Sequence, residues 1–118
     1  MEFFPKVKQF DKGYQWIIVE LAKQMTFDDF QPLTGISWLE FMGGMLGAFD
    51  PNATPKQKQM NEGLMKTSQF YNKIMNIVKE CDYAVGDILS IVNWGKIGNR
   101  PVIIDAGLTK EIYKKHYQ

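Results

Sequence analysis

Three polar residues in the last third of the chain have types and a spacing that could hold a metal ion. Asp87 and Asn93 bracket the segment DILSIVN, and Asp105 ends the apolar run PVIID. The pair Gly98-Asn99 lies between two apolar segments and predicts the tip of a hairpin that begins just after Asn93. Because a hairpin brings its two ends together, we expect Asn93 and Asp105 to lie close in space. Carboxylate and amide oxygens are hard ligands that suit Mg²⁺.

A structural interpretation of the same positions stays open. Asp-x-Gly after a strand is a common turn, and Gly86-Asp87 is a second turn signal. Asn93 precedes Trp94-Gly95, where an Asn tolerates a left-handed backbone. The residues by themselves therefore allow either a metal site or a pair of turns.

The elements that must position these residues are predicted from apolar periodicity and turn signals. In chain order we expect a hairpin over 3–21, a short helix that starts at Thr26 and is stopped by Pro32 and Gly35, a helix opened by the capping box of Ser37 and Glu40, a long helix over 55–81 with Thr54 as its N-cap, a hairpin between Asn93 and Asp105, and a short terminal helix over 109–117. The predicted fold class is therefore α+β. It has an N-terminal β-hairpin, a helical middle with one long helix, a short C-terminal β-hairpin and a terminal helix.

Two of these predicted helices contain residues that are unusual for their positions. Gly43, Gly44 and Gly47 weaken the second helix by up to about 1 kcal/mol each relative to Ala, unless they permit close approach of a neighbouring backbone. The long helix has apolar residues at steps of three and four, with the polar Thr67 in a gap of the stripe. Cys81 ends that stripe and is expected to be a core residue.

Composition limits the class of protein. A chain of 118 residues that is 45% hydrophobic fits one domain over 1–118, and a net charge of +1 gives no reason to expect a nucleic acid as partner. Cys81 and His116 are the single residues of their types, so neither a disulfide nor a Cys/His zinc site is expected. The sequence contains neither an apolar run of about 18 residues nor a signal peptide. These features predict a cytoplasmic protein without a membrane segment.

The order of long helix, Asp, Asn, hairpin and Asp-x-Gly resembles the catalytic half of the protein-kinase fold. There H-R-D-L-x-x-x-N supplies the catalytic base and one metal ligand, and D-F-G supplies the other. The resemblance implies Asp87 as catalytic base, Asn93 and Asp105 as metal ligands, and Glu20 at the hinge that meets adenine. "DILSIVNWG" and "PVIIDAGLT" look especially like the divergent kinase-like proteins of bacteriophages, and the resemblance covers roughly residues 3–113.

The sequence also departs from the kinase pattern. The spacing from Asp87 to Asn93 is one residue longer, Val85-Gly86 replaces His-Arg, and Ala106 replaces the Phe of D-F-G. The Gly-rich loop and the strand-three Lys of a kinase would lie upstream of the first matched strand, and the substrate platform would follow the last residues. These parts position and neutralise the phosphates. We therefore expect a pseudokinase-like protein that has no catalytic activity and needs no cofactor.

The expected function is binding. A non-catalytic kinase-like protein of phage origin would dock on a host or viral macromolecule and modulate or inhibit it. A protein partner or a second copy of the chain is expected to cover the exposed N-terminal strands, above all the apolar run at 16–20. Trp38, Trp94 and Tyr113 are candidate anchors and equally good core residues. The alternatives are a nucleotide-binding phosphotransferase that uses Mg-ATP and is completed by a partner chain, or a fragment of a longer kinase-like protein.

Overall fold

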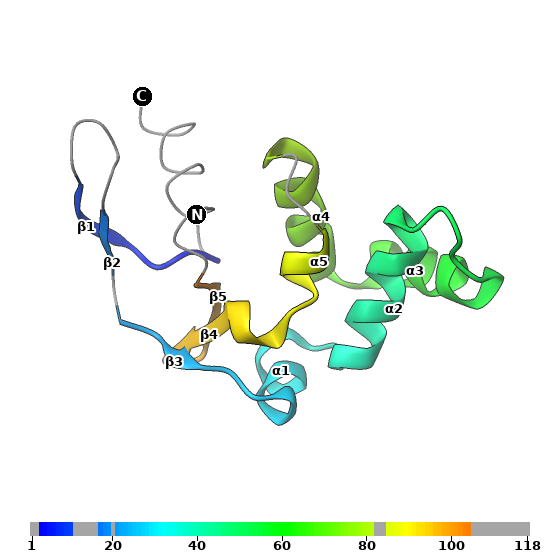
Figure 1. Cartoon of the computed structure of the whole chain (residues 1–118). Coiled ribbons are helices and arrows are strands. Elements are labelled where there is room, and N and C mark those ends of the chain that lie inside the picture. The colour runs from blue at the N-terminus through cyan, green and yellow to red at the C-terminus, as the bar shows by residue number, and fades with distance from the viewer. Residues whose placement is uncertain (1–2, 11–16, 20, 82–84, 105–118) are drawn as a thin grey trace. The chain divides into compact units, whose positions relative to one another are not determined.

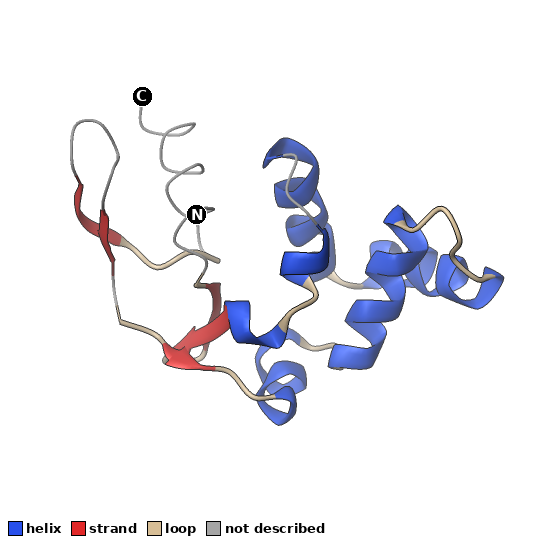
Figure 2. Cartoon of the chain, viewed as in Figure 1, coloured by secondary structure: helices blue, strands red, loops and turns tan. Residues whose placement is uncertain are grey.

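The computed structural model contains α-helices and antiparallel strands (Figure 1, Figure 2). The described residues are 3–10, 17–19, 21–81 and 85–104. The chain divides into two compact units, a strand unit of Met1–Met25 with Ser90–Gln118 and a helical unit of Thr26–Leu89. The predicted α+β class is therefore confirmed. The expected terminal helix over 109–117 lies outside the described residues.

The helical unit contains helices of which the first three begin at capping residues that the sequence predicts. They are α1 (Phe27–Thr34), α2 (Trp38–Phe49), α3 (Pro55–Thr67), α4 (Gln69–Cys81) and α5 (Val85–Ile88). The side chains of Thr26, Ser37 and Thr54 each accept a hydrogen bond from the backbone N–H three residues later, and the side chain at that later position accepts one from the cap's own N–H. Such caps contribute about 1 kcal/mol each. The predicted starts of α1, α2 and α3 are confirmed.

The end of α1 follows one of its two predicted stop signals. Gly35 has a left-handed backbone with φ 85°, and its N–H donates to the carbonyl of Gln31 at 2.8 Å. Pro32 instead lies inside α1, so the prediction that it helps to stop the helix is wrong. A proline costs the helix one hydrogen bond, here to the carbonyl of Asp28. Both residues are exposed, so water can meet that carbonyl.

The predicted long helix over 55–81 is also wrong, because Ser68 separates α3 from α4. Ser68 has an extended backbone with φ −118° and ψ 112°, and its hydroxyl accepts a hydrogen bond from the N–H of Tyr71 at 3.0 Å. The side-chain amide of Asn72 donates to the carbonyls of Met65 and Ser68 at 2.7 and 3.0 Å, which satisfies the end of α3. The polar gap in the apolar stripe thus marks a break. Within the described residues no helix has the length and apolarity that a membrane span needs.

Aromatic side chains fill the core of the helical unit. Phe30 from α1 lies at the centre, with ring centroids 4.9 Å from Trp38, 5.2 Å from Phe41 and 5.8 Å from Phe70. Phe30 and Phe41 are completely buried. Aromatic pairs at such distances add about 0.5–1.5 kcal/mol each beyond the area that they bury. This cluster joins α1, α2 and α4 into one body.

The glycines of α2 allow a close contact with α3. A Cβ at Gly47 would overlap the backbone carbonyl of Gln57, and a Cβ at Gly43 would lie 2.6 Å from the sulfur of Met60. A Cβ at Gly44 would lie 2.7 Å from a methyl group of Leu64. The three glycines therefore permit the approach of a neighbouring helix, which was one of the two expectations for them.

A buried tyrosine joins α3 to α4. The hydroxyl of Tyr71 donates to Oδ1 of Asn61 at 2.6 Å, and its ring packs edge-on against Phe41 at 6.3 Å. Burial raises the pKa of Tyr71 from 10.0 to about 12, because an ionised phenol would lose its hydration. The neutral phenol is thus the form that the fold stabilises.

The strand unit contains both predicted hairpins. β1 (Val7–Phe10) pairs antiparallel with β2 (Ile17–Val19). A second sheet has the order β3 (Lys23–Gln24), β4 (Trp94–Ile97) and β5 (Arg100–Ile103), and all of its pairs are antiparallel. Gly98 takes φ 61° between β4 and β5, which confirms the predicted hairpin tip. Trp94, Val102 and Ile103 are buried, as expected for apolar strands in a core.

Candidate functional site

The hairpin holds Asn93 beside the end of strand β5. Asn93 is the last residue of a 3-10 turn, Ile91–Asn93, and its carbonyl accepts a hydrogen bond from the N–H of Ile104 at 2.8 Å. The hairpin therefore brings Ile104 to Asn93, and the proximity of Asn93 and Asp105 stays a prediction. Asp105 is the next residue and lies outside the described part of the chain.

Gln24 fixes the turn that carries Asn93, a role that no sequence pattern predicts. Its side-chain amide donates to the carbonyl of Ile91 at 3.0 Å and to that of Trp94 at 3.2 Å. The N–H of Met25 donates to the Trp94 carbonyl as well, at 3.1 Å. The turn is thus tied to β3, almost seventy positions earlier in the chain. A lone Gln after a Lys carries no periodicity or motif from which this contact could be foreseen.

The other residues of the predicted site belong to the helical unit or lie outside the described residues. Asp87 lies in α5 of the helical unit, with an exposed side chain. Asn93 belongs to the strand unit. Glu20, the predicted hinge residue, lies outside the described residues, as does Asp105. Among the residues that can be described, no group of three or more His, Cys, Asp and Glu side chains is arranged to hold a metal ion.

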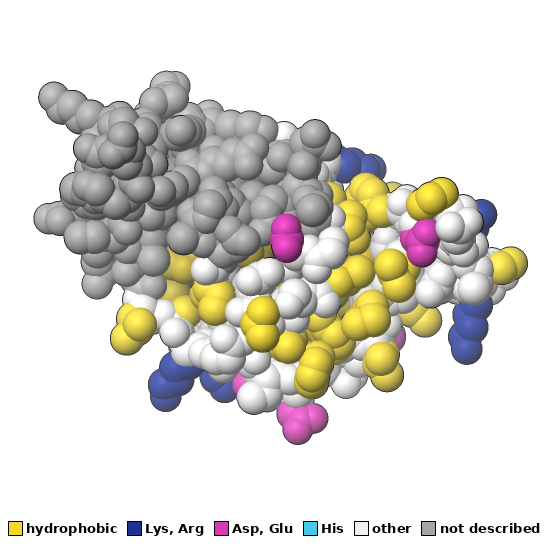
Figure 3. All heavy atoms as spheres, in the orientation of Figure 1, with side chains coloured by type: hydrophobic (Ala, Val, Ile, Leu, Met, Phe, Trp, Pro, Cys, Tyr) yellow, Lys and Arg dark blue, Asp and Glu magenta, His cyan; other side chains and the backbone are white. Residues whose placement is uncertain are grey.

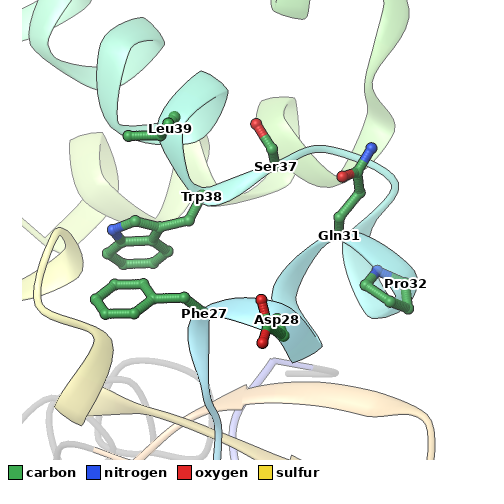
Figure 4. Close-up of a pocket in the computed structure, with 7 residues that line it drawn as sticks. All are labelled: Phe27, Asp28, Gln31, Pro32, Ser37, Trp38 and Leu39. Atoms are coloured by element: carbon green, nitrogen blue, oxygen red, sulfur yellow. The ribbon is translucent and has the colours of Figure 1, made fainter.

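A second candidate site lies in the helical unit, where α1 and α2 both begin (Figure 4). It is an open pocket of about 490 Å³, lined by Phe27, Asp28, Gln31 and Pro32 from α1 and by Ser37, Trp38 and Leu39 at the start of α2. The capping boxes at Thr26 and Ser37 fix the first turns of both helices. The side chains around the pocket therefore project from ordered backbone.

The apolar side chains that line this pocket include two exposed ones and one that is buried in the core. Leu39 is 77% exposed and Phe27 is 59% exposed, whereas Trp38 between them is 6% exposed. The rings of Phe27 and Trp38 lie side by side in Figure 4, with centroids 5.9 Å apart in an edge-to-face arrangement. Trp38 and Trp94 are thus core residues, and the exposed side chains at this site are those next to Trp38, with Phe27 its neighbour in space and Leu39 its neighbour in sequence. Sequence reasoning missed Phe27 and Leu39, because both occupy helix starts whose outward direction depends on packing.

The pocket lies in an acidic part of the chain. Residues 24–55 contain four carboxylates and no Lys, Arg or His. Asp29 and Glu40 close the two capping boxes, and Asp28 is exposed at the pocket. The pocket therefore combines an apolar surface with negative charge.

Comparison with known proteins yields no family model, no curated protein and no solved structure that matches this chain. The kinase-like resemblance therefore stays a prediction from short motifs, and the function has to be inferred from the residues and their geometry.

Proposed function

We propose that this chain is a binding protein that docks on a protein partner through the α1–α2 pocket, on a scaffold of the kinase-like partial type. The observation that carries the proposal is the pair of exposed apolar side chains, Phe27 and Leu39, at one open pocket over the buried ring of Trp38. Under the resemblance to bacteriophage proteins, the partner is a host or viral macromolecule that the chain modulates or inhibits.

The composition of α2 supports this proposal. Its only polar or charged side chain is Glu40. One face, with Phe41 and Met45, lies in the aromatic core, and the glycine face lies against α3. The third face carries Leu39, Met42 and Leu46 at helical spacing, of which Leu39 is exposed and the other two are half-buried. A helix that is apolar on every side belongs in a fully buried environment.

Burial of this face would yield useful binding energy. Complete burial of a Leu or Phe side chain is worth about 1.5–3 kcal/mol. Single exposed apolar residues are normal on protein surfaces, but neighbouring ones around a pocket mark interaction sites. Hydrophobic side chains are visible on the described surface in Figure 3. A partner that covers Leu39 and Phe27 would complete the environment that α2 lacks.

The experiment is affinity capture with three tagged chains. The wild type is compared with Leu39→Ser and with Met65→Ser, a matched control because Met65 is 42% exposed on α3 and does not line the pocket. We expect a partner that the wild type and Met65→Ser retain and that Leu39→Ser loses. A wild-type chain that stays monomeric and captures nothing would refute the proposal.

A nucleotide-binding phosphotransferase is the second candidate. The observation in its favour is the hydrogen bond from the N–H of Ile104 to the carbonyl of Asn93, because Ile104 is the last described residue before Asp105 in the sequence. In that case Asn93 and Asp105 would hold Mg²⁺ with ATP, Asp87 would be the base and Glu20 would lie at the adenine. Calorimetry with Mg-ATP tests this candidate. Heat of binding that Asp105→Asn abolishes would favour it, and the absence of heat would remove it.

A further inference from the structure

We propose that the α1–α2 pocket binds a cationic peptide segment that places one bulky apolar side chain against Phe27, Trp38 and Leu39. The inference rests on the proposed binding function and adds to it the chemistry of the partner. A cationic segment with an apolar anchor fits this pocket because its centre is apolar and the surrounding charge is negative.

The lining of the pocket suits an apolar anchoring side chain. Phe27 comes from α1 and Leu39 from α2, and Trp38 packs against both Phe27 and the buried Phe30, at 5.9 and 4.9 Å. An inserted side chain would therefore meet apolar groups that the core already holds in place. Three polar side chains, Asp28, Gln31 and Ser37, share the lining. An apolar pocket with a few polar groups is the usual composition of a specific binding site.

The charge at the starts of α1 and α2 determines which residues of the peptide can flank the apolar anchor. Two helices begin at the pocket, and each helix start carries the equivalent of about half a positive charge. The exposed carboxylates of Asp28 and Glu40 lie in the same first turns. Together with the two helix starts they leave about one negative charge. One hydrogen-bond donor at each helix start is also engaged, since the N–H groups of Asp29 and Glu40 already donate to the side chains of Thr26 and Ser37.

The positive charge of the chain lies elsewhere in its sequence. The net charge of the whole chain is +1, and residues 24–55 contribute only carboxylates. Lys or Arg residues on either side of the anchor would therefore be attracted to the pocket and repelled from the rest of the chain. An acidic peptide would instead be repelled by the pocket and attracted to the rest of the chain.

The test is a titration of the ¹⁵N-labelled full chain with synthetic peptides of about fifteen residues. One set has a central Trp, Phe or Leu flanked by Lys, and the matched set has Glu in place of every Lys. We expect saturable shifts of the backbone resonances of Phe27, Trp38 and Leu39 with at least one Lys peptide, and none with its Glu counterpart. Leu39→Ser should weaken binding about tenfold or more. Asp28→Asn should weaken it about three- to fivefold, as removal of an exposed ion pair does.

Met65→Ser is the control and should bind like the wild type, and the thermal unfolding of each variant shows that it is folded. The inference is overturned if Glu peptides bind equally well, if the shifts map away from the pocket, or if no peptide binds. It is also overturned if the pocket resonances shift with protein concentration alone, which would make a second copy the occupant. A captured partner that Leu39→Ser still retains would leave a binding function in place but refute this site.

Discussion

Replacement of Gly47 by Ala tests whether the glycines of α2 hold the helical unit together. In an exposed helix interior, Gly→Ala stabilises by about 1 kcal/mol, because Ala loses less backbone entropy on folding. At Gly47 the new methyl group would overlap the carbonyl of Gln57. Overpacking costs about 1–3 kcal/mol. The upper figure applies here, because the obstacle is backbone that the Thr54 capping box fixes.

The net expectation for Gly47→Ala is a loss of about 2 kcal/mol, or about 8 °C in melting temperature for a chain of this size. Gly63→Ala is the matched control, since Gly63 lies inside α3 with nothing within 4 Å of the position of its Cβ. It should gain about 1 kcal/mol, or about 4 °C. Gly43→Ala should fall between the two, because its obstacle is the flexible thioether of Met60.

Urea and thermal unfolding, followed by circular dichroism, measure all three variants. The expected order of stability is Gly63→Ala, Gly43→Ala, Gly47→Ala, with about 3 kcal/mol between the first and the last. If Gly47→Ala stabilised the protein as much as Gly63→Ala does, α2 and α3 would not be in backbone contact at Gln57, and this account of the glycines would be wrong.

Three further predictions concern hydrogen bonds. Because burial raises the pKa of Tyr71 to about 12, the stability that its neutral form contributes is complete below pH 10 and is lost as the pH rises toward 12. Tyr71→Phe should flatten this alkaline loss in a pH series of urea unfolding, and should cost about 1 kcal/mol at neutral pH by removing the bond to Asn61. Thr54→Ala should lower the free energy of unfolding by about 1 kcal/mol, because it removes the cap of α3. Unfolding followed by circular dichroism measures this change, and an unchanged free energy would contradict the capping role. Gln24→Ala should speed amide exchange at Ile104 by loosening the Asn93 turn, and equal exchange rates in both proteins would argue against it.

The predictions that succeeded rest on local chemistry. Thr26, Ser37 and Thr54 start helices because a side-chain oxygen meets an N–H only three residues away, whatever the rest of the chain does. Gly98 marks a hairpin tip because few other residues adopt a positive φ. These signals also placed Asn93 near the end of β5, since a two-residue tip fixes which positions pair.

The predictions that failed, and the contact that was missed, depend on hydrogen-bond geometry, some of it local and some of it between distant residues. The expected long helix is interrupted at Ser68, where hydrogen bonds from Tyr71 and Asn72 stabilise the break. The apolar stripe continues across this break and therefore does not reveal it. Pro32 is tolerated because it and Asp28, whose carbonyl would accept the lost hydrogen bond, are both exposed residues. Gln24 reaches Ile91 from the other end of the sequence. A periodic pattern contains none of this information, because it records spacing and not the geometry of partners.

The exposure of Leu39 follows from the same packing that the glycine substitutions test. Successive residues of a helix point about 100° apart, so the direction of Gly43 and Gly47 fixes the direction of every other residue in α2. To bury Leu39 in its own unit, α2 would have to rotate, and the glycine face would then leave α3. Bulkier residues would come against the Gln57 carbonyl in its place. The close contact between α2 and α3 and the exposure of Leu39 therefore follow from the same orientation of α2. A variant that weakens the α2–α3 contact should consequently disturb the pocket as well, whereas Leu39→Ser should leave that contact intact.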